Sequence, residues 1–213
     1  IILNPHGDCP MSTLSVDTIQ GKTTAGTVKL PSGSVLQTVS EVDNTGLSLG
    51  SSATSKFMDV GITTKVANST INVRFYTAIF KTSTSYGNRD VDVALALGFK
   101  TGSATSSSGD YTAISTYAPS RENITFSGSV SRAFYSSDAF YVGESFAGRY
   151  HPIDTIYNEE SFSPSLAAGT TIRIACFAKQ DYAQSTTLVL GSSLNGMSDS
   201  GSTSCLTITE ISA

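Results

Sequence analysis

The chain has 213 residues and a formal net charge of −4, a length that suits one all-β domain with a hydrophobic core plus a short appendage. Charged residues make up only 14% of it, against about 25% in ordinary soluble domains, and the basic ones are scattered singly, which argues against nucleic-acid binding. No apolar run is long enough to span a bilayer, so no membrane insertion is predicted.

Residues 11–33 contain two short runs, 14–19 and 27–30, in which apolar and polar residues alternate. This period is typical of β-strands that bury one face. Each run has few apolar side chains, and an isolated two-stranded ribbon is only marginally stable in water. We therefore expect residues 1–33 to form an extended β segment, an anchor or stalk that packs against copies of itself or another protein. The residues predicted to make these contacts are Leu14, Val16, Ile19, Val28 and Leu30.

From residue 34 onward, alternating runs are separated by stretches rich in Gly, Ser and Thr, which predict turns and loops. Residues 43–55 and 101–110 are predicted loops. Strands are expected within residues 34–42, 57–62, 69–80, 90–99, 111–117, 124–130, 139–146, 152–157, 165–178, 186–190 and 205–211.

Two of these runs predict their buried face most clearly, because residues two apart in a strand share a face. In 69–80 the apolar face comprises Ile71, Val73, Phe75 and Ile79, and the other face carries Asn72, Arg74 and Tyr76. In 90–99 the apolar face comprises Val91, Val93, Leu95, Leu97 and Phe99. The opposite face of this second strand carries Asp92, Ala94, Ala96 and Gly98, and is small enough for a neighbouring segment to approach closely.

No stretch shows a sustained apolar period of 3.6 residues, so helix should be minor. Many short strands with turn signals and no alternating helices predict an antiparallel double-sheet β-sandwich, jelly-roll-like, over residues 34–213. A barrel with another connection order is the alternative, because periodicity does not fix the order of the strands.

The cysteines Cys9, Cys176 and Cys205 have neither metal-ligand spacing nor a disulfide framework. The interpretation of Cys176 and Cys205 as small buried core residues is favoured over a bridge between them. No metal or other cofactor is predicted.

A hydrolytic triad would have to use His151, with Ser145 and either Asp154 or Glu144, but residues 143–147 only half-match a nucleophile elbow. Such matches are expected by chance in a chain this rich in Ser and Gly.

The paired carboxylates that glycoside cleavage needs could be Glu159 with Glu160, or Asp90 with Asp92. Adjacent strand residues point to opposite faces, which disfavours the first pair. No third acid lies near the second pair in the sequence. We expect no enzymatic activity.

Tyrosines concentrate between Tyr111 and Tyr157, among Ser, Asn, Asp and Arg. Flat aromatic rings with a polar rim suit a glycan-binding surface, and a trimer interface also favours Tyr and Arg. Core and cross-strand packing is an equally good interpretation of any single tyrosine. The candidate receptor contacts are Tyr111, Tyr117, Tyr135, Tyr141 and Tyr150.

Residues 12–33, running into 35–39, resemble the N-terminal signature of a large group of tailed-phage virion proteins. The segments 61–71, 166–172 and 205–211 also fit that group. The resemblance implies a homotrimer with a short intertwined β-stalk and a C-terminal jelly-roll head. Members serve as tail-fibre or receptor-binding tips, or as head fibres and decoration proteins.

We therefore expect a structural protein of a phage virion, assembled in the host cytoplasm, whose trimeric fibre-like module binds a host-surface receptor, a glycan. Other virion proteins of the capsid or tail would be its partners. The alternative is a capsid decoration or cement protein that stabilises the head.

Overall fold

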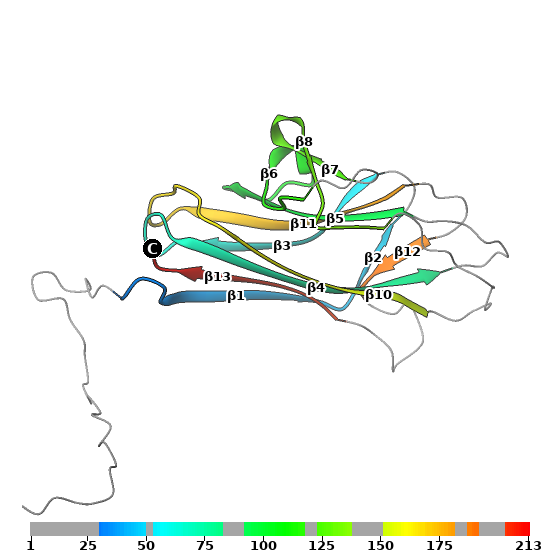
Figure 1. The fold of residues 1–213 in the computed structure, drawn as a ribbon, viewed down its shortest axis with the longest axis horizontal. Helices are drawn as coiled ribbons and strands as arrows, with labels where there is room; N and C mark the ends of the chain where they lie inside the picture. The colour runs from blue at the N-terminus through cyan, green and yellow to red at the C-terminus, as the bar shows by residue number, and fades with distance from the viewer. Residues whose placement is uncertain are drawn as a thin grey trace, which may run out of the picture. The chain divides into compact units, whose positions relative to one another are not determined.

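The computed structural model describes residues 30–49, 53–82, 92–117, 123–137, 151–181, 187–191 and 203–213. Residues Ser32–Ala213 form one compact unit, and its strands are arranged as an antiparallel β-sandwich (Figure 1). The predicted all-β, double-sheet fold is confirmed. Within the described ranges, helical structure is limited to two short 3₁₀ turns, η1 (Ser108–Asp110) and η2 (Ser127–Ser129).

One sheet, called the open sheet here, has the order β1, β13, β4, β10, with β12 and β2 continuing it beside the second half of β4. Its strands are β1 (Val35–Asp43), β13 (Ser204–Ile211), β4 (Thr70–Thr82), β10 (His151–Phe162), β12 (Thr187–Leu190) and β2 (Leu47–Leu49).

The other sheet, called the covered sheet, has the order β3, β11, β5, and both β6 and β9 pair with β5. Its strands are β3 (Thr54–Thr63), β11 (Thr171–Asp181), β5 (Asp92–Thr101), β6 (Thr112–Ala113) and β9 (Tyr135–Ser137). A separate small ribbon is formed by β7 (Ile124–Phe126) and β8 (Val130–Arg132).

The strand pairs are nested along the chain. β1 pairs with β13, β3 with β11, β4 with β10, and β5 with β9, all antiparallel. Early strands thus pair with late ones in reverse order, as if one long hairpin were wrapped around a single core. This is a jelly-roll arrangement, and it decides between the two connection orders that the sequence left open.

The core between the sheets is built from the predicted apolar faces. All four apolar residues of β4 on this face, Ile71, Val73, Phe75 and Ile79, are fully buried. Val93, Leu95 and Leu97 meet them from β5. Both face predictions are confirmed for these residues, because a period of two places alternate side chains on one side of a strand.

A second, smaller core lies on the outer face of the covered sheet, beneath the ribbon of β7 and β8 (Figure 1). Ala94 and Ala96 are fully buried there against Tyr111 and Phe126. The rings of Tyr111 and Phe126 each meet Phe177 edge-on, with centroids 5.0 and 5.8 Å apart. The neighbour that the small face of β5 predicted is therefore a segment of the same chain.

A charged cluster fastens the chain over this second core, residues 108–117 and 123–133, here called the covering segment, to the sheet. The Asp59 side chain is only 9% exposed and accepts hydrogen bonds from Arg173 Nε at 2.6 Å, Lys56 Nζ at 2.6 Å and the Tyr111 hydroxyl at 3.0 Å. Arg173 crosses Gly61, where a Cβ would lie 2.8 Å from its Nη1. A buried carboxylate needs such partners, since an unpaired one costs several kcal/mol.

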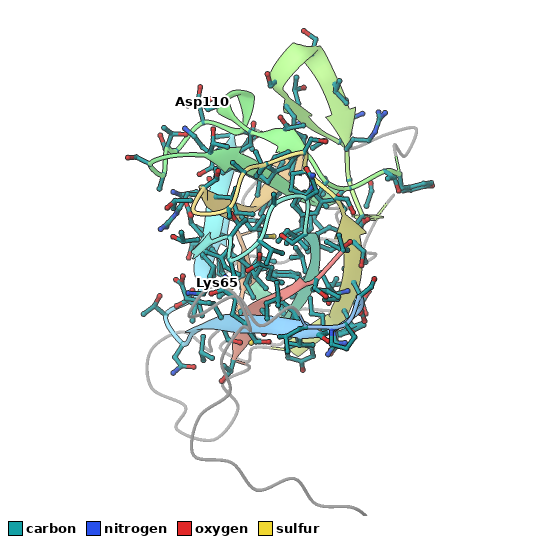
Figure 2. The ribbon with its side chains drawn as sticks, turned by 90° about the vertical axis from the view of Figure 1, so that its left-hand side faces the viewer. Lys65 and Asp110 are labelled. Atoms are coloured by element: carbon teal, nitrogen blue, oxygen red, sulfur yellow. The ribbon has the colours of Figure 1, made fainter. Side chains whose placement is uncertain are left out.

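Figure 2 shows the sandwich from one end, with Asp110 labelling η1 beside the covered sheet and Lys65 labelling the loop between β3 and β4. This loop is held by Glu210, which is fully buried. Its carboxylate accepts hydrogen bonds from the backbone N–H of Lys65 at 2.8 Å, from that of Val66 at 3.2 Å and from Gln37 Nε2 at 2.6 Å.

Three of the predicted elements differ from the structure. Residues 111–117 were predicted as a strand, but only Thr112–Ala113 pair with β5 before Ile114 and Ser115 both donate to the Leu97 carbonyl. The predicted strand 124–130 is divided by η2, where Gly128 and Ser129 have positive φ. The predicted loop 43–55 contains the short strand β2. The predicted strand 139–146 lies outside the described residues.

Candidate binding surface

The outer face of the open sheet carries three straight rows of side chains, because its strands are in register. The first, called the aromatic row, comprises Val42, Cys205, Tyr76 and Tyr157. The second comprises Ser40, Thr207, Arg74 and Glu159. The third comprises Thr38, Thr209, Asn72 and Ser161.

The aromatic row is open to solvent. Tyr157 is 61% exposed, Val42 56% and Tyr76 39%, and Cys205 is half-buried between them. Figure 1 shows no described strand packed over this face, in contrast to the outer face of the covered sheet. Single exposed apolar residues are ordinary, but an aligned row of them indicates an interaction surface.

A hydrogen-bonded network lies beside the aromatic row and is centred on Glu159. Its Oε2 accepts from the Tyr157 hydroxyl at 2.8 Å, and its Oε1 accepts from Asn72 Nδ2 at 2.9 Å and lies 3.3 Å from Arg74 Nε. Asn72 Nδ2 also donates to Ser161 Oγ at 3.0 Å. The carboxylate is thus held in one orientation by three side chains from two strands.

These contacts shift the pKa values of Glu159 and Tyr157 in opposite directions. The hydrogen bond from Tyr157, followed by those from Asn72 and Arg74, lowers the pKa of Glu159 below its ordinary value. The same bond to Glu159 raises the pKa of Tyr157, because it stabilises the neutral hydroxyl as a donor. Both shifts favour the ionised carboxylate of Glu159 together with the neutral phenol of Tyr157.

A shallow hollow with a volume of about 200 Å³ opens in this face. It is lined by Arg74, Phe75, Tyr76, Tyr157, Cys205 and Thr207. Clefts that hold drug-sized ligands usually measure about 300–1,000 Å³, so this one fits a smaller group. Its aromatic and polar linings come from three adjacent strands and meet only in the folded sheet.

The predicted receptor tyrosines do not gather at this hollow. Tyr111 is fully buried with its hydroxyl bonded to Asp59, so the prediction that it contacts a receptor is wrong. Burial, more than Asp59, raises its pKa. Tyr117 is 63% exposed and its carbonyl accepts from the Ala133 N–H in the covering segment. Tyr141 and Tyr150 lie outside the described residues.

Tyr135 joins the two sheets. Its hydroxyl, on β9 of the covered sheet, donates to Asp154 Oδ2, on β10 of the open sheet, at 2.9 Å. Burial, and then the Asp154 carboxylate, raises the pKa of Tyr135 far above its usual range. Tyr135 is half-buried, and this bond makes it a structural contact between the sheets.

Tyr76 and Tyr157 are the exposed tyrosines of the hollow, and neither was among the predicted contacts. Sequence periodicity placed Tyr76 on the outward face, and Tyr157 lies in the tyrosine-rich stretch. Only the register of β4 with β10 sets one directly opposite the other. The signal in the sequence was alternation, and the missing information was which strands are neighbours.

The structure describes only some of the residues weighed for catalysis. Glu159 and Glu160 lie on opposite faces of β10, as alternation predicts, and burial raises the pKa of Glu160. Asp154 bonds to Tyr135, whereas Asp90, Glu144 and Ser145 lie outside the described residues. His151 begins β10.

Cys176 and Cys205 are both free thiols on different faces of the sandwich. Cys176 is fully buried in the main core, as predicted, and burial raises its pKa well above the ordinary value. Cys205 is half-buried on the outer face instead of in the core. Cys9 lies outside the described residues.

Of the anchor residues, Leu30 alone lies in the described part of the chain, where it is exposed. Leu14, Val16, Ile19 and Val28 lie outside it. Across the described ranges, no three His, Cys, Asp or Glu side chains are grouped so that they could hold a metal ion. No helix in those ranges is long and apolar enough to cross a membrane.

No protein-family model and no curated protein matches the chain. Among solved structures, it is similar to a chain of the "Structure of infectious bursal disease virus Gx strain", with 12% sequence identity and a TM-score of 0.33. The match covers 96% of this chain and 43% of the other, so this chain spans less than half of its neighbour's length.

Proposed function

We propose that this chain is a non-enzymatic structural protein of a tailed-phage particle, a self-associating jelly-roll module that binds a glycan receptor on the host surface. The observation that carries the proposal is the solvent-exposed aromatic row on the outer face of the open sheet. The covered sheet buries its outer face beneath Tyr111 and Phe126, whereas the open sheet leaves Tyr76 and Tyr157 exposed. Such an asymmetry is typical of a scaffold with one binding face.

Composition and the opening segment support the assignment to a virion. Few charged residues and many Ser, Thr and Gly suit a surface packed into an ordered array. The resemblance of residues 12–33 to tailed-phage virion proteins favours that source and a trimer held by an N-terminal stalk. Leu30 and Val35 are exposed apolar residues, consistent with contacts to other copies.

The position of the protein in the particle tests the proposal. Purified particles of the encoding phage would be labelled with gold-conjugated antibodies raised against residues 32–213 and imaged by electron microscopy. We expect label at fibre tips. Label over the heads, together with heads that lose stability when the gene is deleted, would instead establish the decoration function, and particles without label would contradict both.

Receptor binding needs a separate measurement. Purified full-length protein should adsorb to host cells and compete with infection, and periodate oxidation of cell-surface glycans should abolish both effects. Adsorption that survives periodate but not protease treatment of the cells would identify a protein receptor. Absence of adsorption to every permissive host would contradict the receptor-binding part of the proposal.

A further inference from the structure

Tyr157 provides a flat apolar platform on the open sheet. Its hydroxyl reaches Glu159, two residues along on the same face of β10, so the ring must lie along the sheet instead of pointing away from it. The residue nevertheless remains 61% exposed. Tyr76 lies directly opposite on β4 and extends the aromatic surface toward Cys205. A ring held in place in this way costs little additional side-chain entropy when a ligand stacks on it.

Hydrogen-bonding groups of both kinds border the platform. The Glu159 carboxylate can accept hydrogen bonds, and the Arg74 guanidinium, which is a planar fork of donors, lies beside it. Thr207 adds a hydroxyl from β13 at the wall of the hollow. The contacts among Glu159, Asn72 and Tyr157 hold the carboxylate before any ligand arrives, which is what a preorganised site requires.

The combination matches one ligand chemistry. A pyranose ring has an apolar face of C–H groups that stacks on aromatic rings, and hydroxyls at its edge that both donate and accept. The hollow of about 200 Å³ is on the scale of a single such ring. Arg74 and Glu159 neutralise each other, so the site does not favour a charged sugar. We propose that the hollow at Tyr76 and Tyr157 binds one neutral pyranose unit of the host-surface glycan, a proposal that rests on the proposed function.

A second copy of the chain is a poorer occupant of this face. Copy-to-copy interfaces are enriched in Tyr and Arg, but they are depleted of Glu, Asp and Ser and are more apolar than the rest of the surface. Here one row of the three is aromatic or apolar, and the row beside it carries Arg74 and Glu159. These two charges are already paired within one chain and leave little charge complementarity for a second one.

The test is nuclear magnetic resonance of the full-length protein, with tyrosine ring signals followed during titration with methyl pyranosides. The probes are methyl α-D-mannopyranoside, methyl β-D-galactopyranoside, methyl α-L-rhamnopyranoside and, as the charged comparison, methyl β-D-glucuronide. We expect a neutral probe to shift the ring signals of Tyr76 and Tyr157, with an affinity that is unchanged by added salt, because a neutral ligand is not screened.

Three variants make the test specific. Tyr157→Ala should abolish the shifts at Tyr76. Tyr157→Phe keeps the platform but releases Glu159, and should weaken binding about five-fold, as the loss of one hydrogen bond implies. Tyr117→Ala removes an equally exposed tyrosine from another surface and should bind like the unaltered protein.

The proposal is overturned if no neutral probe shifts these signals, if only the glucuronide does so, or if Tyr157→Ala binds unchanged. It is also overturned if Tyr157→Ala lowers the sedimentation coefficient of the protein, because the face would then join copies of the chain. None of these results affects the position of the protein in the particle, so the virion assignment is tested independently.

Discussion

Gly98 leaves space for the ring of Phe126: a Cβ at position 98 would lie 2.5 Å from Phe126 Cε1 and 2.9 Å from the Cβ of Tyr111. Because position 98 has no side chain, the covering segment packs closely against β5, whose Ala94 and Ala96 are also small. A residue with any side chain at position 98 must push the segment away from the sheet.

The first prediction is that Gly98→Ala destabilises the protein by about 1–3 kcal/mol, the usual cost of overpacking a tight core. Urea unfolding followed by circular dichroism measures it. Gly109→Ala is the matched control, because a methyl group at position 109 would lie 3.4 Å from its nearest neighbour, Ser107 Oγ, and it should change stability by less than about 0.5 kcal/mol. Equal effects of the two substitutions would contradict the packing argument.

The second prediction concerns Asp59, which fastens the covering segment. Asp59→Ala leaves Arg173, Lys56 and the Tyr111 hydroxyl without their shared acceptor, and should cost on the order of 3 kcal/mol. Tyr111→Phe removes one of the three donors and should cost about 1 kcal/mol. Thermal or urea unfolding checks both. Asp110→Asn, an exposed acid in η1, is the control, and a comparable loss there would contradict the assignment.

The third prediction is a loss of stability in alkali. Burial raises the pKa of Tyr111 and of Tyr135 above the ordinary value of about 10. A raised pKa in the folded state means that the neutral phenol is favoured there, so this stabilisation is complete below about pH 10 and is lost as the pH rises toward the folded-state values. Unfolding free energies measured between pH 9 and 11.5 should fall, and the fall should be shallower in Tyr135→Phe. If the pH profile of Tyr135→Phe were identical to that of the unaltered protein, the contribution assigned to the Tyr135 hydroxyl would be contradicted.

The fourth prediction concerns the network beside the aromatic row. The Tyr157 hydroxyl is the largest cause of the lowered pKa of Glu159, so Tyr157→Phe should raise that pKa toward the value of an ordinary Glu. Carboxyl-carbon chemical shifts followed from pH 2 to 7 measure the change. Tyr117→Phe should leave the titration of Glu159 as it is, and an unaltered Glu159 curve in Tyr157→Phe would mean that the bond does not persist in solution.

The fifth prediction separates assembly from folding. If the proposed stalk holds the trimer, the combined substitution of Val16, Ile19, Val28 and Leu30 by Ser should reduce the mass in sedimentation from three chains to one chain of 22.2 kDa. The β-sheet circular-dichroism spectrum should remain, because the sandwich has its own core. A trimer that survives these substitutions would place the assembly contacts in the jelly roll.

Much of the fold could be read from local pattern. The alternation in residues 69–80 and 90–99 located two long strands and the face that each buries, and the small residues of the second strand predicted a close neighbour. A period of two is a property of the single strand, so it is visible before any partner is known. The prediction failed at residues 111–117, where only Thr112–Ala113 pair with β5 and Tyr111 and Ile114 are buried in the two different cores.

The candidate site was missed for a related reason. Tyr76 and Tyr157 are far apart in the chain, and nothing in either local pattern says that one faces the other. From the sequence, several tyrosines were equally good candidates for receptor contact. One of them, Tyr111, is a core residue whose hydroxyl bonds to Asp59.

By itself the sequence determined that this protein is all-β and made a double-sheet sandwich the favoured arrangement over a barrel, because alternation and turn residues act over a few neighbouring positions. The tertiary structure alone decided the nested pairing of the strands, which side of the sandwich is covered, and which tyrosines remain exposed together. Those properties depend on register between strands distant in the chain, and register is set by the packing of the whole core.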